Sequence, residues 1–218
     1  RCREAGLETE LVPTDHGRPA VVAHTERRND FPHLFLYGHY DVTPTGPSSP
    51  KSLLLAHLCA LRAFHLVAGY LPVDLTLLVE GDQRLGSPIL ERHLKYLAAK
   101  RAPFDLALLA LPFEQKFEAA PKLDQTPDPH NSRVSESEAI LIRAVESASP
   151  GSTLACMVEP FHSLLGVQAW VVGLEDTEAK REPNSDQFQN RIKTIMRTLN
   201  GVAKEFHAHQ SVSKGRAG

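Results

Sequence analysis

The stretch HLFLYGHYDV at residues 33–42 is mostly apolar up to Gly38, and the polar group His-Tyr-Asp follows at residues 39–41. A second stretch, VDLTLLVEGD at residues 73–82, has the same pattern, because its apolar run is followed by Glu-Gly-Asp. Short runs rich in Val and Leu predict strands that are buried on both faces of a sheet. The polar residues after each run are therefore expected at the carboxyl end of a strand, where open α/β sheets usually bind ligands.

Runs of this kind alternate with amphipathic segments along the rest of the chain. The alternation predicts an α/β fold in which a mainly parallel sheet is sandwiched by helices. Ser87 is expected to cap one of these helices, with Pro88 at its first position. Further strands are predicted at residues 19–25, 105–111 and 166–174, and helices at residues 52–67, 88–97 and 185–207.

The pattern fits one domain over residues 1–207. Residues 112–134 interrupt it, since they are rich in Pro, Asp, Gln and Lys and predict a loop. Residues 208–218 are polar and are expected to form a disordered tail.

Composition excludes several classes of protein. The chain has 218 residues and a formal net charge of -2, so no basic excess points to a nucleic-acid partner. No continuous apolar run reaches the roughly 18 residues that predict a membrane span. Cys2, Cys59 and Cys156 are too scattered for a disulfide framework and favour a reducing compartment. Since no apolar signal region opens the chain, we expect an intracellular location, in the cytoplasm or in an organelle after removal of a transit segment.

Three segments together resemble one family of enzymes. They are PHLFLYGHYDVTP at residues 32–44, LLVEGDQRLGSP at residues 77–88 and LLGVQAWVVGLEDTEAKREPNSDQF at residues 164–188. In sequence and in order they are similar to zinc metallopeptidases of the aminoacylase, carnosine dipeptidase and glutamate carboxypeptidase type. The resemblance implies a zinc-exopeptidase-like core. In active members two zinc ions at the strand ends, bridged by an Asp, activate a water with the help of a Glu base.

The first part of that site is retained only partly. His39 stands at the position of the first His ligand, and Asp41 stands where the family has the Asp that orients this His. The resemblance places Ser49 at the position of the bridging Asp, and a hydroxyl cannot replace a bridging carboxylate. His39 and Asp41 are interpreted as a hydrogen-bonded structural pair, with a remnant metal site as the alternative.

At the remaining site positions that the resemblance assigns, the family's catalytic and metal-binding residues are replaced. Gln83 and Arg84 replace the Glu-Glu pair that supplies the base and a ligand. Leu111 replaces an Asp after a strand, and Arg181 replaces the last His. An amide cannot take a proton from water, and a guanidinium repels a metal ion. We therefore expect no catalytic residue, no zinc site and no cofactor in this chain.

The family also inserts a lid domain that closes on the substrate and commonly forms the dimer. Residues 112–134 stand at its position and are far too few for such a module. The resemblance therefore implies a core without the lid, and no homodimer formed by it.

Three hypotheses on function remain open. The first is a catalytically inactive peptidase-like domain, or pseudoenzyme, with a structural or protein-interaction role as a subunit of a larger assembly. The second is an active but divergent zinc-dependent hydrolase or dipeptidase of the same family. The third is a module that binds small anions through Arg84 and Arg181, two cations expected at neighbouring strand ends.

Overall fold

The computed structural model describes most of the core of the chain. Its elements are one short 3-10 helix, seven strands and the helices α1, α2 and α5. The described residues are 1–14, 18–28, 30–41, 50–82, 86–88, 90–101, 103–110, 140–141, 143–144, 147–148, 153–157, 164–165, 169–173 and 185–215. The elements are η1 (Arg3–Ala5), β1 (Glu8–Val12), β2 (Ala20–His24), β3 (His33–His39), α1 (Pro50–Ala68), β4 (Asp74–Glu80), α2 (Leu90–Arg101), β5 (Leu106–Leu109), β6 (Thr153–Met157), β7 (Ala169–Gly173) and α5 (Ser185–Gly215).

The seven strands form one mixed sheet in the order β1-β2-β4-β3-β5-β7-β6. The four central strands β4, β3, β5 and β7 run parallel, whereas β1, β2 and β6 pair antiparallel with their neighbours. Only three of the six pairings are parallel, so the prediction of a mainly parallel sheet is not confirmed. The predicted α/β class is correct, because helices cover a sheet whose centre is parallel.

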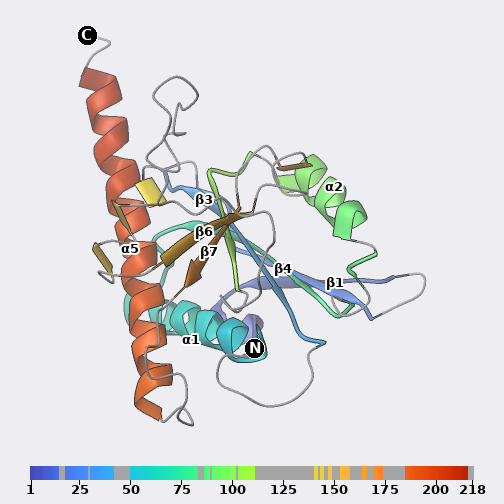
Figure 1. Cartoon of the computed structure of the whole chain (residues 1–218). Helices are drawn as coiled ribbons and strands as arrows, with labels where there is room; N and C mark the ends of the chain where they lie inside the picture. The colour runs from blue at the N-terminus through green and yellow to red at the C-terminus, as the bar shows by residue number, and fades with distance from the viewer. Residues whose placement is uncertain are drawn as a thin grey trace.

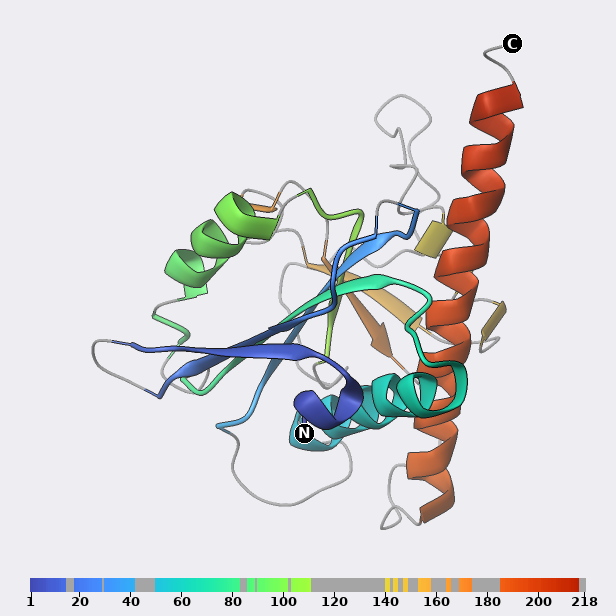
Figure 2. The ribbon, with the colours of Figure 1, turned by 180° about the vertical axis from the view of Figure 1, so that it is seen from behind.

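Helices cover both faces of this sheet (Figures 1 and 2). Alternate residues of β3 divide between the faces because successive strand side chains point in opposite directions. Leu34 and Leu36 lie in the core that the sheet forms with α1 and α5. Phe35 and Tyr37 lie in the second core, which includes Leu94 and other residues of α2.

All five predicted strands and the helices predicted at residues 52–67, 88–97 and 185–207 are present with shifted ends. The strands β1 and β6 were not predicted. The helix α5 continues to Gly215, past residue 207, where its apolar pattern ends. Ser211 Oγ donates to the carbonyl of His207 at 2.8 Å inside this extension, so the expected disordered tail is helical as far as Gly215. Residues 112–134, expected as a loop in place of a lid, lie outside the described residues.

The helix α1 is unusually apolar for a helix on the surface of a sheet. Within the described residues, Lys51–Ala68 is the one stretch long and apolar enough to cross a membrane by length and composition, with a mean hydropathy of 1.3. A core helix of a soluble protein meets the same criterion, and α1 packs on the sheet through Leu54, Leu61 and Phe64. Only 33% of that stretch is buried.

The two-sided burial of β4 predicts a large cost for a cavity at its centre. Leu77 is fully buried, and Leu77→Ala is expected to lower the free energy of unfolding by about 2–5 kcal/mol. Leu11→Ala is the control, because the Leu11 side chain is exposed, and it should change stability by less than about 0.5 kcal/mol. Urea denaturation measures both, and equal costs would contradict the described core.

Candidate functional site

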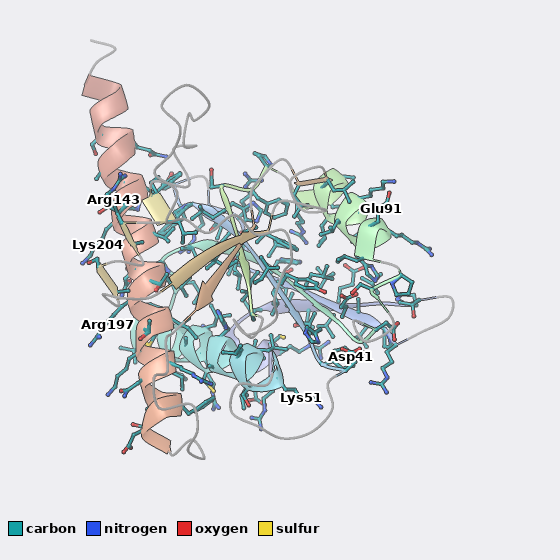
Figure 3. The ribbon with its side chains drawn as sticks, in the orientation of Figure 1. Asp41, Lys51, Glu91, Arg143, Arg197 and Lys204 are labelled. Atoms are coloured by element: carbon teal, nitrogen blue, oxygen red, sulfur yellow. The ribbon has the colours of Figure 1, made fainter. Side chains whose placement is uncertain are left out.

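The carboxyl ends of β3 and β4 bring four ionisable side chains together. The parallel register pairs His39 with Glu80, so the two residues are neighbours across the strands. Asp41 and Asp82 follow them just after the strand ends. All four are buried, although buried acids and histidines normally need a partner. Figure 3 shows Asp41 at the end of β3.

His39 and Asp41 form a hydrogen-bonded pair. The distance from His39 Nδ1 to Asp41 Oδ1 is 3.1 Å, which fixes the orientation of the imidazole ring. The other ring nitrogen, Nε2, is buried and has no hydrogen-bond partner among the described residues. Burial lowers the pKa of His39 below its ordinary value, while the charges of Asp41 and Glu80 act in the opposite direction. This geometry is compatible with both a structural pair and a remnant metal ligand.

Glu80 is held by two hydroxyl donors on the same face of the sheet. Its Oε1 accepts hydrogen bonds from the Tyr37 hydroxyl and from Ser87 Oγ, the latter at 2.5 Å. The second oxygen, Oε2, has no partner within the described part of the chain. Burial, with a smaller contribution from the charge of Glu80, raises the pKa of the Tyr37 phenol well above its ordinary value. The phenol therefore stays protonated and donates.

Ser87 differs from its predicted role as a helix cap. Within the described residues its side chain donates to Glu80, and its backbone carbonyl accepts a hydrogen bond from the Leu90 N–H at 3.0 Å. Its φ of 51° is unusual for a residue other than glycine. The hydrogen bond to Glu80 is therefore made from a strained backbone conformation.

The turn after β4 is closely packed. Asp82 Oδ2 accepts the backbone N–H of Arg18 at 3.1 Å, and Tyr40 donates its hydroxyl to the carbonyl of Pro19 at 2.7 Å. A Cβ added to Gly81 would lie 2.5 Å from the Tyr40 ring. Only glycine therefore fits between these two strand ends without displacing Tyr40.

Five of the residues singled out in the sequence cannot be placed. The substituted positions Ser49, Gln83, Arg84, Leu111 and Arg181 all lie outside the described residues. The two members of the proposed anion site are among them.

The described residues do not fit a two-zinc centre. Across the described ranges no three His, Cys, Asp or Glu side chains lie close enough to hold a metal ion. In the cluster, His39 Nε2 and Glu80 Oε2 are the two buried atoms without a described partner, since Glu80 Oε1 accepts from Tyr37 and Ser87. Sequence reasoning missed this role of Tyr37. The available signal was the spacing of Tyr37 and His39 on one face of the same strand.

Comparison with known proteins supports the fold but not the site. No protein-family model matches the sequence, and no curated protein matches it. The structure is similar to that of LapA from Legionella pneumophila, with a TM-score of 0.54 and 9% identity over 94% of this chain and 62% of that one. LapB from the same organism gives a TM-score of 0.52 at 10% identity over 94% of this chain and 61% of that one. Another LapA structure is described as an aminopeptidase.

Human carnosine dipeptidase 1 is similar over a smaller part. Its TM-score is 0.44 at 18% identity, over 50% of this chain and 30% of the dipeptidase, and similarity at that level carries no argument about the site. The chain thus spans about three fifths of the length of LapA and less than a third of the dipeptidase. The findings show a peptidase-like fold.

Removal of the phenol at residue 37 tests the described cluster. Tyr37→Phe leaves Glu80 with fewer donors in a buried place, so we expect a loss of about 1–3 kcal/mol in the free energy of unfolding. Tyr96→Phe is the matched control, since its hydroxyl donates to the exposed carboxylate of Glu10 at 3.1 Å. Chemical denaturation should show almost no effect of the control. Similar losses in both variants would contradict a buried Tyr37–Glu80 bond.

The buried histidines predict a loss of stability in mild acid. Burial lowers the pKa values of His33, His39 and His93 below the ordinary 6.5, so the unfolded chain takes up their protons first. Stability is therefore complete above pH 6.5 and falls below it, by about 1.4 kcal/mol per pH unit for each proton taken up. His39→Gln should make this fall shallower, whereas exposed His207→Gln should not. Urea midpoints between pH 5 and 8 measure the slope, and a slope unaffected by His39→Gln would contradict the assignment.

Proposed function

We propose that this chain is a peptidase-like domain that has lost two-zinc hydrolysis. In this proposal the fold serves a structural or protein-interaction role, as a subunit of a larger assembly. A core and an active site are separable, so a fold can persist after its chemistry is lost. The observation that carries the proposal is the donor set at the strand ends.

That donor set is poor in metal ligands. At the positions that the resemblance assigns to metal binding, the sequence offers a hydroxyl, an amide, an aliphatic side chain and two guanidinium groups beside His39. At ~4 Å and an effective dielectric constant of ~20, each unit of charge repulsion costs about 4 kcal/mol. Arg84 and Arg181 at these positions would therefore oppose a dication where carboxylate and imidazole groups would attract one.

The polar cluster itself needs no metal to be stable. Glu80 accepts from Tyr37 and Ser87, and Asp82 accepts from the backbone of Arg18. These bonds tie the ends of β3 and β4 to each other and to the segment before β2. They support the proposal that hydrogen bonds within the protein hold the strand ends in place without a metal ion.

A divergent hydrolase is the second candidate. Two buried atoms, His39 Nε2 and Glu80 Oε2, lack hydrogen-bond partners among the described residues, and such atoms in natural proteins often face a water or an ion. If the chain is active, it is a metal-dependent amidohydrolase or dipeptidase with an altered ligand set. The anion-binding alternative rests on Arg84 and Arg181.

Metal content separates the first two candidates. Protein purified without chelator should contain far less than one zinc ion per chain by elemental mass spectrometry, and should not hydrolyse dipeptides or N-acyl amino acids with added zinc. His39→Ala should leave the metal content unchanged. About two zinc ions per chain, with hydrolysis that His39→Ala abolishes, would replace the proposal with the hydrolase.

A further inference from the structure

Most of the exposed large apolar side chains in the described residues lie on α1 or on the turn after it. Five large apolar side chains are exposed among the described residues. Four of them belong to α1 or to the turn after it: Leu55 (42%), Leu66 (69%), Val67 (85%) and Tyr70 (53%). The fifth is Leu11, in the edge strand β1. Clustered exposed apolar residues mark interaction sites, whereas single ones do not.

Part of this surface is a continuous row along the helix. Leu58 and Cys59 follow Leu55 by three and four residues, Arg62 follows them by four and three, and Leu66 follows Arg62 by four. The five residues therefore share one face of α1. We name these five residues the outer stripe. Leu55, Arg62 and Leu66 are exposed, and Leu58 and Cys59 are half-buried. With a rise of about 1.5 Å per residue, the stripe is about 16 Å long.

The stripe contains one cation, Arg62, and a second cation, Lys51, lies one turn before it, with no acid on the same helix. The sequence of α1, PKSLLLAHLCALRAFHLVA, contains Lys51 and Arg62 but neither Asp nor Glu. Figure 3 shows Lys51 at the start of the helix. Arg62 Nη1 lies 3.8 Å from Glu4 Oε2, but that oxygen is also 2.9 Å from Arg1 Nη1. Glu4 is thus shared by two arginines, and the Arg62 side chain is still 50% exposed.

We propose that the outer stripe binds an amphipathic helix of a partner protein. The partner helix would set an apolar row against Leu55, Leu58 and Leu66 and carry acidic residues that meet Arg62 and Lys51. Apolar rows three and four residues apart are the surface by which helices pack together, and arginine pairs strongly with carboxylates. The inference rests on the interaction role proposed above and names its surface.

The charges disfavour two other occupants. In an antiparallel pair of two copies, Arg62 of each chain would lie within a turn of the other and no acid on either α1 would neutralise them. A membrane would receive the stripe with Arg62 at its middle, between Leu55 and Leu66, and a cation there is costly in hydrocarbon. An acidic helix satisfies both the apolar row and the cation.

The test uses the whole chain and a synthetic peptide. The probe is a fluorescent amphipathic helical peptide with leucines at three- and four-residue spacing and flanking glutamates, and its twin carries lysines in place of the glutamates. Fluorescence anisotropy should show binding of the glutamate peptide. Leu66→Ser should weaken it about tenfold, and Leu11→Ser is the matched control because Leu11 is also exposed, at 65%.

A charge reversal gives the second readout. Arg62→Glu should weaken binding of the glutamate peptide about tenfold and favour the lysine twin. Arg197→Glu, at an exposed position of α5, should change neither. Circular dichroism melting curves confirm that the variants fold.

Several outcomes would overturn the inference. One is peptide binding that neither Leu66→Ser nor Arg62→Glu changes. Another is a dimer of the chain that either variant disrupts. A third is binding to phosphatidylserine vesicles that depends on the stripe, without binding of the peptide. A chain that hydrolyses dipeptides yet binds the peptide through the stripe would refute the proposed function while supporting the stripe. An inactive, zinc-free chain that does not bind the peptide would refute the stripe alone.

Discussion

Every residue of β3 and β4 is buried, and this two-sided burial determines how the rest of the molecule is arranged. A parallel strand pair with no exposed residue must be covered by helices on both faces, which α1 and α5 do on one side and α2 on the other. Charged side chains can then lie only at the ends of the strands, unless a hydrogen-bond or ion-pair partner within the core compensates for their burial. The cluster of His39, Asp41, Glu80 and Asp82 lies at such an edge.

The same burial makes an unpaired polar atom in this cluster costly. A carboxylate removed from water is costly, and the hydroxyls of Tyr37 and Ser87 supply donors to Glu80. Gly81 allows the close approach of Tyr40 between the two strand ends. These contacts form within the described part of the chain and hold the ends of β3 and β4 together.

The sequence was informative where burial was complete. β3 and β4 were predictable because a strand buried on both faces is a continuous apolar run, and α1, α2 and α5 because their periodicity is helical. β1 was missed because it is an edge strand of five residues with a mixed burial pattern. The antiparallel direction of β1, β2 and β6 could not be predicted, because composition does not determine how strands pair. His39 and Asp41 were found from the family resemblance and from their place after a predicted strand. The spacing of Tyr37 and His39 puts both on one face of β3, but the partner of Tyr37 follows from the register between β3 and β4, which the sequence of one strand does not contain.

The two helices that share a face of the sheet differ in a way that bears on function. Along α5, Leu199 and Val202 are buried, while Lys193, Arg197 and Lys204 are exposed, as expected for a helix with one side in water. Figure 3 marks Arg197 and Lys204 on this helix. In contrast, the outer side of α1 exposes Leu55 and Leu66 beside Arg62. Since the described part of α5 exposes polar residues where it meets water, the exposed leucines of α1 are not a general property of the helices on this face, and they form the surface that we propose a partner helix covers.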